Sequence, residues 1–483
     1  MGAETIMRKT KIVCTVGPAT DDDKILENMM KAGMNVARFN FSHGDYEMHR
    51  TRFEQVVRLR EKLGLPIATM LDTKGPEVRL GKFKDGKPVE IKDGGEIILT
   101  TEDVECTAEK VSVSFKELPA DVSIGMSILI NDGVIELKVL KISGKEILCR
   151  IINGGVLSDN KGVNIPGAKL SMPYLSERDM SDLEFGAKMQ YDFIAASFVR
   201  SAADVNYLRK FCHSLGWYSP RIIAKIENME GVENIDEILE AADGIMVARG
   251  DMGVEIPFEQ IPAIQKDIIR KGYKAGKQVI TATQMLESMI TNPRPTRAEI
   301  TDVANAIYDG TSAIMLSGET AAGKHPVEAV QTMALIARTT EKDINYESRL
   351  YARAADHSTS IANAVSHAAV TTALDLGAKA VVTVTKSGAT ARMISKFRPG
   401  CMIIGCATSS IIMRQMNLSW GVYPVLIDEK SSTDELFEHA LSRSVESGLL
   451  ENGDIVVITA GIPLGVSGTT NMLRVEKAVV SAE

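Results

Sequence analysis

The sequence predicts an α/β fold: a (β/α)8 TIM barrel with an inserted all-β lid domain and a C-terminal α/β domain. Three observations predict it. Eight short, β-branched apolar runs alternate with helical patterns, one interval replaces this alternation with closely spaced turns, and a second strand–helix series follows residue 347. An open doubly wound sheet is the alternative for the first series. Eight strands favour the closed barrel.

The eight barrel strands are runs that are almost continuously apolar. A barrel strand is covered by helices outside and by packed side chains inside, so it loses the usual apolar–polar alternation. The runs are KIVCTVG (11–17), MNVARFN (34–40), PIATMLD (66–72), DFIAASF (192–198), RIIAKI (221–226), GIMVARG (244–250), QVITAT (278–283) and SAIMLSG (312–318).

Helical patterns separate these strands. In one of them, Thr296 precedes Glu299 by three residues, which is a capping box, and the helix-breaking Pro293 and Pro295 come just before it. Three further examples are DDDKILENMMKAG (21–33), SERDMSDLEFGAKMQ (176–190) and FEQIPAIQKDIIRKGYKAG (258–276).

Residues 74–170 form a β-rich interval with hairpin-like turns such as NDGV and SGKE. We therefore expect the barrel to comprise residues 1–73 and 171–346, with 74–170 as an inserted β-barrel-like lid. An insertion in the loop after a barrel strand lies over the end of the barrel that carries active sites. A hinged lid over a catalytic mouth is the expected arrangement.

Residues 347–483 repeat the strand–helix alternation and have their own apolar runs, so we expect a separate core there. The four strands are AVVTVT (380–385), CMIIGCA (401–407), GVYPVLI (421–427) and DIVVITA (454–460).

Composition and charge narrow the function classes. The 483 residues are 45% hydrophobic and 24% charged, with a net charge of −8 and no long run of one sign. This argues against a nucleic-acid or membrane-surface role. The first residues show no signal peptide, no run approaches a membrane span, and six cysteines include no CxxC pair. The cytoplasm is the expected compartment.

Polar side chains gather where the predicted barrel strands end. Side chains two apart on a strand share a face, and this spacing is found in three pairs or triplets: Arg38, Asn40 and Ser42; Lys225 and Glu227; Arg249 and Asp251. Asp72, Thr73, Thr283, Gln284, Ser317 and Glu319 follow other strands. Structural polar residues would scatter between faces, so the shared spacing favours a catalytic mouth.

The residue types at this mouth suit a small anionic substrate carrying a phosphate. Glu227 and Asp251 offer hard oxygen ligands, too few to cage Ca²⁺ but suited to Mg²⁺ completed by substrate and water. Lys225 is a point cation for charge on a transferring phosphoryl group, and Arg38 and Arg79 can grip phosphate. Backbone N–H groups near Gly250 suit a carboxylate.

A monovalent cation is the third expected ligand. Asn40, Ser42 and Asp72 together offer neutral oxygens and one anion, which fits such an ion better than a second divalent one. Three alternative interpretations compete with these assignments. Asp72 could simply form a turn, His43 could be a packed core histidine, and Arg249-Gly250-Asp251 is also the RGD adhesion tripeptide. The adhesion reading requires export and exposure, and the tripeptide's place at a strand end predicts burial.

Nine strings in this order resemble the pyruvate kinase family over nearly the whole chain. They are TKIVCTVGPA, NVARFNFSHG, LDTKGPEVR, KGVNIPG, IAKIEN, MVARGDMGVE, TATQMLESM, NPRPTRAE and IMLSGETA. The chain ends at Glu483, which is similar to bacterial-type members without an additional phosphohistidine-like domain. The resemblance implies transfer of the phosphoryl group of phosphoenolpyruvate to ADP, in a homotetramer that uses Mg²⁺ (or Mn²⁺) and K⁺.

The resemblance also implies residue roles. Lys225 would stabilise the transferring phosphoryl group, and Arg38 and Thr283, with the backbone of Gly250 and Asp251, would hold phosphoenolpyruvate. The remaining roles are Mg²⁺ on Glu227 and Asp251; K⁺ on Asn40, Ser42, Asp72 and Thr73; nucleotide contacts from Asn40, His43 and Arg79; and a proton relay among Thr283, Ser317, Glu319 and water.

Two positions refine this picture. Glu77 stands where relatives that dispense with K⁺ tend to carry lysine, so we expect K⁺ dependence. Ser201 stands where relatives often place a nucleotide-contacting lysine, and the neighbouring Arg200 could replace it.

The C-terminal domain is similar to the family's regulatory domain. The string TKSGATAR (385–392) places hydroxyls and glycine just before a helix, an anion-binding arrangement, with an ordinary capped loop as the alternative. With GVSGTTN (465–471) it would form a pocket for a sugar phosphate or AMP. The expected effector residues are Thr385, Lys386, Ser387, Gly388 and Thr390. A Mg²⁺-dependent lyase or aldolase on a similar barrel is the rival enzyme class, but it would need neither the lid nor Arg79 and Lys225.

Overall fold

The computed structural model of the protein describes residues 8–354, 360–462 and 470–479. Eight parallel strands close into a barrel in the order β1-β17-β16-β15-β14-β13-β3-β2, which is the predicted (β/α)8 fold. Their bounds are β1 (Lys11–Thr15), β2 (Val36–Asn40), β3 (Ala68–Asp72), β13 (Phe193–Ala196), β14 (Arg221–Ile226), β15 (Gly244–Ala248), β16 (Gln278–Ala282) and β17 (Ala313–Leu316).

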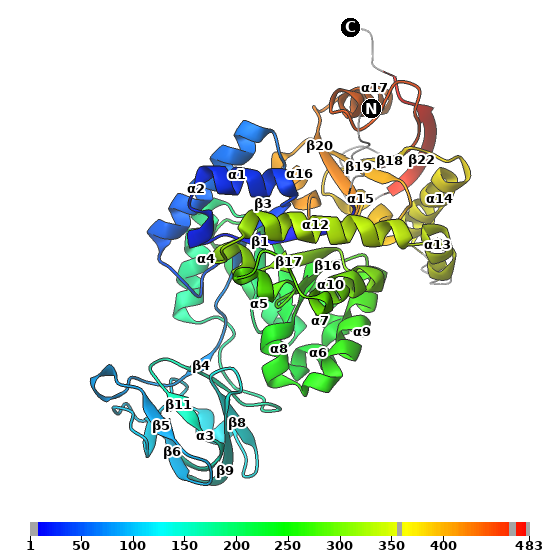
Figure 1. Ribbon diagram of the computed structural model, residues 1–483. Coiled ribbons are helices and arrows are strands. Elements are labelled where there is room, and N and C mark those ends of the chain that lie inside the picture. The colour runs from blue at the N-terminus through cyan, green and yellow to red at the C-terminus, as the bar shows by residue number, and fades with distance from the viewer. Residues whose placement is uncertain (1–7, 355–359, 463–469, 480–483) are drawn as a thin grey trace.

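Helices surround this barrel (Figure 1). Thr296 caps α10 in the predicted capping box with Glu299. The helices are α1 (Asp23–Ala32), α2 (Tyr46–Leu63), α4 (Glu177–Met189), α5 (Ala202–Ser214), α6 (Met229–Glu233), α7 (Ile235–Ala241), α8 (Arg249–Glu255), α9 (Ile261–Lys274), α10 (Arg297–Asp309), α11 (Gly318–Ala321) and α12 (Pro326–Asp343), with short 3-10 turns η1 (Pro18–Thr20), η3 (Phe258–Gln260) and η4 (Glu287–Ile290).

A β-rich module is inserted between β3 and β13. Its seven-stranded sheet has the order β4-β12-β8-β9-β10-β6-β7, and β11 pairs with β5 in a second small sheet. The bounds are β4 (Val78–Arg79), η2 (Lys84–Gly86), β5 (Val89–Ile91), β6 (Glu96–Thr100), β7 (Lys110–Ser112), α3 (Leu118–Asp121), β8 (Ser127–Ile130), β9 (Ile135–Ser143), β10 (Glu146–Asn153), β11 (Gly155–Leu157) and β12 (Gly162–Asn164).

The two edges of the seven-stranded sheet meet. Leu80, just beyond β4, forms an isolated bridge with Val113, just beyond β7, and Gly81 N donates to the Ser112 carbonyl. The sheet therefore curls around its own apolar core, whose buried members come from residues 78–165. In Figure 1 this module stands apart from the barrel, at the end where α6 and α8 lie.

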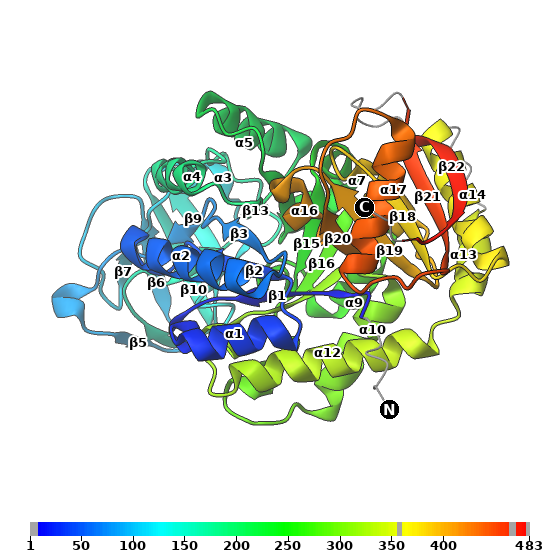
Figure 2. The same cartoon turned by 90° about the horizontal axis from the view of Figure 1, so that it is seen from above.

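The C-terminal unit is a five-stranded sheet in the order β20-β19-β18-β21-β22 with helices on both faces. Val382 of β18 packs in the core under α17, while its neighbour Val381 packs in the core under α14; Figure 2 shows the two helices on opposite faces. The bounds are α13 (Tyr346–Ala354), α14 (Ile361–Asp375), β18 (Ala380–Val384), α15 (Ala389–Lys396), β19 (Met402–Ala407), α16 (Ser410–Met416), β20 (Val422–Leu426), α17 (Thr433–Glu446), β21 (Ile455–Gly461) and β22 (Thr470–Lys477).

One strand of the C-terminal unit was not predicted. β22 pairs antiparallel with β21 at the sheet edge, and its residues mix exposed and buried positions without the apolar run of the four predicted strands. Leu418, after α16, packs among the side chains that fill the barrel interior. The C-terminal unit therefore closes the end of the barrel opposite the inserted module.

Candidate active site

Two basic side chains meet one buried carboxylate at the barrel mouth. Arg38 on β2 places Nε 2.6 Å from Asp72 Oδ2, and Lys225 on β14 places Nζ 3.2 Å from Asp72 Oδ1. Asp72 ends β3 and is 1% exposed, so it is not a simple turn residue. Burial alone would raise the pKa of its carboxyl, but the charges of Arg38 and Lys225 hold that pKa below its usual range. Asp72 stays ionised and fixes both cations.

Lys225 is also close to Glu227, as their shared spacing predicted. Nζ lies 2.9 Å from Glu227 Oε1 in an ion pair. The second oxygen, Oε2, accepts the Phe198 N–H at 2.5 Å. Although burial opposes the charged form of Lys225, Asp72 and Glu227 raise its pKa above the ordinary value. The ammonium group is therefore charged and held between two carboxylates.

The surroundings of Glu227 fit a bound cation. Its side chain is fully buried, and beyond the Lys225 ion pair Oε1 has no further hydrogen-bond partner among the described residues. Burial raises the pKa of Glu227 to about 8, with Lys225 opposing and Asp251 adding to the rise. No group of three or more metal-ligating His, Cys, Asp or Glu residues gathers in the described part of the chain. A divalent ion here would thus have two protein carboxylates and further oxygens from substrate and water.

The strand spacing predicted for Arg249 and Asp251 is wrong. β15 ends at Ala248, and α8 begins at Arg249. The Arg249 guanidinium points to the neighbouring β16 end, donating to the Thr283 carbonyl at 2.6 Å and to Asp302 at 2.7 Å. The predicted burial of the RGD tripeptide holds only in part: Arg249 and Gly250 are half-buried, and Asp251 is exposed. Arg249 is fixed in a helix, unlike an extended adhesion loop.

Thr283 and Gly250 are in direct contact. The Gly250 N–H donates to Thr283 Oγ1 at 2.7 Å, and that hydroxyl donates to the Ala282 carbonyl at 2.6 Å. Thr283 and Gln284 both have positive φ, 66° and 53°. Such backbone is uncommon for non-glycine residues and is found at functional sites. The turn after β16 is therefore shaped to present Thr283 to the first turn of α8.

The four residues expected to hold a monovalent cation lie on adjacent strand ends. Asn40 and Asp72 are register partners between β2 and β3. Ser42 is two residues beyond the end of β2, so the predicted strand spacing does not reach it, but its N–H donates to Asn40 Oδ1 at 3.1 Å. Thr73 follows Asp72 directly. The neutral oxygens and one carboxylate are therefore neighbours.

A cavity of about 540 Å³ lies between the mouth and the inserted module. It is lined by His43, Arg79 and Asp251 among others. His43 is exposed, so the reading of a packed core histidine is wrong; the packed histidine is His49, whose ring stacks on Phe41 with centroids 4.0 Å apart. Three predicted residues from the barrel and the module thus share one cavity.

Arg79 is held within the inserted module. Its Nε lies 2.8 Å from Glu77 Oε2, and another of its nitrogens donates to the Asn160 carbonyl at 2.8 Å. Lys74 Nζ lies 3.8 Å from the same Glu77 oxygen. Glu77 is therefore the counter-ion of Arg79, and a phosphate that binds Arg79 must compete with it.

Three further basic residues, Lys161, Lys169 and Arg200, line the same cavity. Arg200 is engaged elsewhere: Nε lies 3.2 Å from Asp204, and another nitrogen donates to the carbonyls of Leu170 and Met172. Ser201 is the N-cap of α5. Lys161 was not predicted as a site residue. It is the first residue of the family string KGVNIPG, and that place in a family motif was the signal that could have identified it.

Ser317 and Glu319 meet through the backbone. Glu319 is fully buried, and its two oxygens accept the Ser317 N–H at 2.7 Å and the Leu286 N–H at 3.1 Å. Ser317 precedes α11 as its N-cap residue. Glu319 therefore braces the loops after β16 and β17.

Ser197 and Phe198 are site residues that the sequence did not reveal. Ser197 Oγ lies 2.7 Å from Lys225 Nζ, and Phe198 supplies the N–H on Glu227. Phe198 also has a positive φ of 52°. The available signal was weak: a hydroxyl residue just after a strand, as at Thr73 and Thr283.

The predicted effector loop precedes α15. Gly388 is its N-cap with φ 75°, Thr385 and Thr390 are buried, and Lys386 is exposed. The Ser387 carbonyl accepts two guanidinium groups, from Arg221 at 3.0 Å and Arg392 at 3.1 Å. Of the stretch GVSGTTN, residues 465–469 lie outside the described residues.

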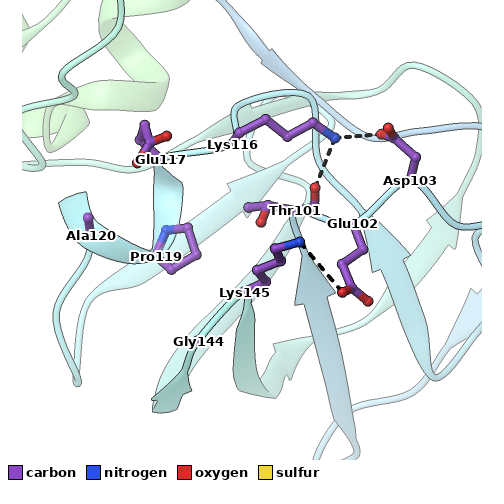
Figure 3. A pocket seen from close by; sticks show the side chains of 9 residues that line it. All are labelled: Thr101, Glu102, Asp103, Lys116, Glu117, Pro119, Ala120, Gly144 and Lys145. Carbon is purple, nitrogen blue, oxygen red and sulfur yellow. Dashed lines mark hydrogen bonds and ion pairs between the residues drawn. The ribbon is translucent and has the colours of Figure 1, made fainter.

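A second concavity, of about 720 Å³, lies within the inserted module (Figure 3). Its lysines are paired: Lys116 with Asp103, and Lys145 with Glu102 at 3.8 Å. It contains none of the predicted site residues.

Among the described helices, none has the length and apolar character needed to span a bilayer.

A TIM barrel with a buried lysine, two carboxylates and arginines at its mouth defines an enzyme that handles phosphorylated, anionic substrates. Comparison with known proteins makes this class specific. Residues 7–330 match the pyruvate kinase barrel domain, and residues 363–476 match the pyruvate kinase alpha/beta domain. The chain belongs to the pyruvate kinase family and is a phosphotransferase.

Individual relatives agree with this assignment. The pyruvate kinase of Staphylococcus saprophyticus is 50% identical over 470 residues, which are 97% of this chain and 80% of the relative. That of Staphylococcus aureus strain MRSA252 is 50% identical over 471 residues with the same coverage. A crystal structure of a pyruvate kinase from Cryptosporidium parvum matches with a TM-score of 0.94 at 39% identity, covering 99% of this chain and 98% of the other.

Proposed function

We propose that this enzyme transfers the phosphoryl group of phosphoenolpyruvate to ADP, giving pyruvate and ATP in the last step of glycolysis. The observation that carries the proposal is the buried ammonium of Lys225, 3.2 Å from Asp72 and 2.9 Å from Glu227. A charged lysine fixed at a barrel mouth stabilises negative charge that develops on a transferring phosphoryl group. Little covalent chemistry is asked of the protein, which supplies position and charge.

Phosphoenolpyruvate would bind between Arg38, Lys225 and the turn after β16. Arg38 contributes a guanidinium for phosphate, and the N–H groups of Gly250 and Asp251 suit the carboxylate. Thr283 completes this set through its contact with Gly250. The Gly250 N–H must leave Thr283 Oγ1 to reach a carboxylate, so substrate binding would rearrange this turn.

Glu227 and Asp251 would hold Mg²⁺ or Mn²⁺, which supplies charge neutralisation for the phosphate oxygens. The buried carboxyl of Glu227, whose Oε1 has no partner among the described residues beyond the Lys225 ion pair, supports this assignment. Asn40, Ser42, Asp72 and Thr73 would hold K⁺.

The nucleotide would occupy the cavity of about 540 Å³, where His43 and Arg79 are found with Lys161. Asn40, at the end of β2, would contact its phosphates. Because Arg79 and Lys161 belong to the inserted module, the module's position would set the affinity for ADP.

The enolate of pyruvate gains its proton after phosphoryl transfer. The proposed relay comprises Thr283, Ser317, Glu319 and water. Within it, Glu319 accepts two backbone N–H groups, which supports a structural role for Glu319 and leaves the Thr283 and Ser317 hydroxyls as candidate proton donors.

Regulation and assembly complete the proposal. Thr385, Lys386, Ser387, Gly388 and Thr390 would bind a sugar phosphate or AMP. We further propose a homotetramer in the cytoplasm. A sizing column that shows only monomer would contradict the tetramer.

The test is turnover of phosphoenolpyruvate and ADP with Mg²⁺, coupled to lactate dehydrogenase, in KCl and in a K⁺-free salt. Lys225→Met is expected to lower kcat by on the order of 10²–10³, the scale for losing one preorganised charge. The surface variant Lys62→Met serves as the control. Equal rates in both salts would contradict the K⁺ site, and no turnover by folded protein, even with sugar phosphates, would overturn the proposed reaction.

A further inference from the structure

Ser197, the residue after β13 that starts the loop towards α5, has its hydroxyl beside the Lys225 ammonium. The side chain is 1% exposed. Its Oγ lies 2.7 Å from Lys225 Nζ, 2.6 Å from the Thr73 carbonyl oxygen and 3.3 Å from Asp72 Oδ1. Such short contacts in a buried site leave the hydroxyl little freedom.

The direction of these hydrogen bonds follows from the donor inventory. A serine hydroxyl has one hydrogen and two lone pairs, a carbonyl only accepts, and an ammonium only donates. The single hydrogen of Ser197 therefore goes to its nearest acceptor, the Thr73 carbonyl at 2.6 Å. A lone pair is then left to accept from Lys225 Nζ at 2.7 Å.

Ser197 differs from the other two oxygens around the ammonium. Asp72 is shared with Arg38, whose Nε lies 2.6 Å away, and Glu227 is the proposed ligand of a divalent ion. The Ser197 hydroxyl is neutral, so it accepts a hydrogen bond from Lys225 without offsetting the charge of the ammonium group. A neutral acceptor can thus hold the ammonium in place while leaving its full charge for an anionic group.

We propose that Ser197 is a positioning residue for phosphoryl transfer, whose hydroxyl holds the Lys225 ammonium at the point where the phosphoryl group is transferred. This inference rests on the proposed function. The hydroxyl is itself oriented by two adjacent strand ends. Ser197 N donates to Thr73 Oγ1 at 3.1 Å while its Oγ donates to the Thr73 carbonyl, and β3 and β13 are paired in the barrel.

The first test compares Ser197→Ala with the wild type in the coupled assay. Misplacement of a reacting group by about 1 Å costs roughly 100-fold, so we expect kcat to fall about 10- to 100-fold with a smaller change in the KM for phosphoenolpyruvate. The matched control is Ser444→Ala on α17, which removes another buried serine hydroxyl, bonded to the Ala440 carbonyl at 2.6 Å. Its kcat and KM should stay at wild-type values.

The second test is a double-mutant cycle with Lys225→Met. If Ser197 acts through Lys225, Ser197→Ala lowers the residual rate of Lys225→Met by less than twofold, because the group it positions is gone. An equal loss in both backgrounds would overturn the proposal, and so would a wild-type kcat for Ser197→Ala.

Folding is checked by thermal denaturation of each variant. If Ser197→Ala does not fold, Ser197→Cys carries the same expectation, because a thiol of similar shape is a weak acceptor. Failure of the proposed function is distinguishable: in that case the wild type itself does not turn over phosphoenolpyruvate and ADP.

Discussion

At the scale of single residues, Asp72 organises the mouth because one carboxylate serves two cations. Arg38 and Lys225 sit on opposite oxygens of Asp72, and all three side chains are largely buried. Glu227 joins this group, and burial raises its pKa to about 8, so a divalent ion bound to Glu227 would favour its ionised form. Such an ion would leave the mouth positive, which suits a phosphorylated carboxylate substrate.

Asp72→Asn should therefore be costly for both folding and activity. The amide keeps the shape of the side chain but leaves Arg38 and Lys225 without their shared counter-ion. Removing one partner of a buried ion pair typically destabilises a protein by about 3–5 kcal/mol. We expect a lower thermal denaturation midpoint and a kcat reduced by at least tenfold.

Asp103→Asn provides the comparison for this variant. Asp103 pairs with Lys116 at the surface concavity of the inserted module, and its side chain is 93% exposed (Figure 3). Exposed pairs contribute about 0–1 kcal/mol, so its midpoint and kcat should match the wild type. A similar midpoint for Asp72→Asn and Asp103→Asn would contradict the counter-ion role.

At the scale of elements, the barrel strands could be predicted because burial on both faces leaves a local signal in the sequence. The start of α8 could not be predicted from the sequence. Arg249 decides whether the chain continues as a strand after Ala248, because its guanidinium donates to the carbonyls of Ala282 and Thr283 on the adjacent strand end. Those partners lie more than thirty residues away, so no local pattern reports them.

The site residues that could be predicted differ from the missed ones in how local their signals are. Lys225 and Glu227 could be predicted because both are charged, stand two residues apart and end an apolar run. Ser197 is a small hydroxyl whose importance comes from contacts with Thr73 and Lys225, which are distant in sequence. Such residues become visible only when the strand order of the barrel is known.

Arg200 contacts the segment that returns from the inserted module to the barrel. Arg200 donates to the carbonyls of Leu170 and Met172, in the segment that connects the module to α4, and its charge is paired with Asp204. Arg200→Gln should loosen this connection. We expect faster limited proteolysis of residues 165–175 and a several-fold rise in the KM for ADP, because hinge residues affect substrate affinity through closure.

An arginine away from the hinge provides the control. Arg58 on α2 pairs with Asp23 on the barrel surface. Arg58→Gln should leave proteolysis and KM unchanged. If Arg200→Gln behaves like Arg58→Gln, Arg200 is not a hinge contact that affects catalysis.

At the scale of the whole molecule, the C-terminal unit and the mouth are connected through the opposite end of the barrel. Arg221 begins β14 and donates to the Ser387 carbonyl of the predicted effector loop and to Asp243 at 2.9 Å. Asp243 immediately precedes β15. The far ends of these two strands lead to Lys225 and Glu227, and to Gly250 and Asp251. We therefore expect a shift of the predicted effector loop to act on the two strands that lead to the proposed metal ligands.

Arg221→Gln should weaken this connection without touching the mouth. We expect the unactivated rate to stay near the wild-type value and the fold-activation by a sugar phosphate or AMP to fall, since coupling free energies of about 1–3 kcal/mol correspond to 5- to 150-fold effects. The matched control is Arg209→Gln, because Arg209 also pairs with Asp243, at 3.1 Å, but is not bonded to Ser387. Rates measured across an effector titration would decide the matter. Retained activation in Arg221→Gln, or equal loss in both variants, would show that the Ser387 contact does not carry the signal.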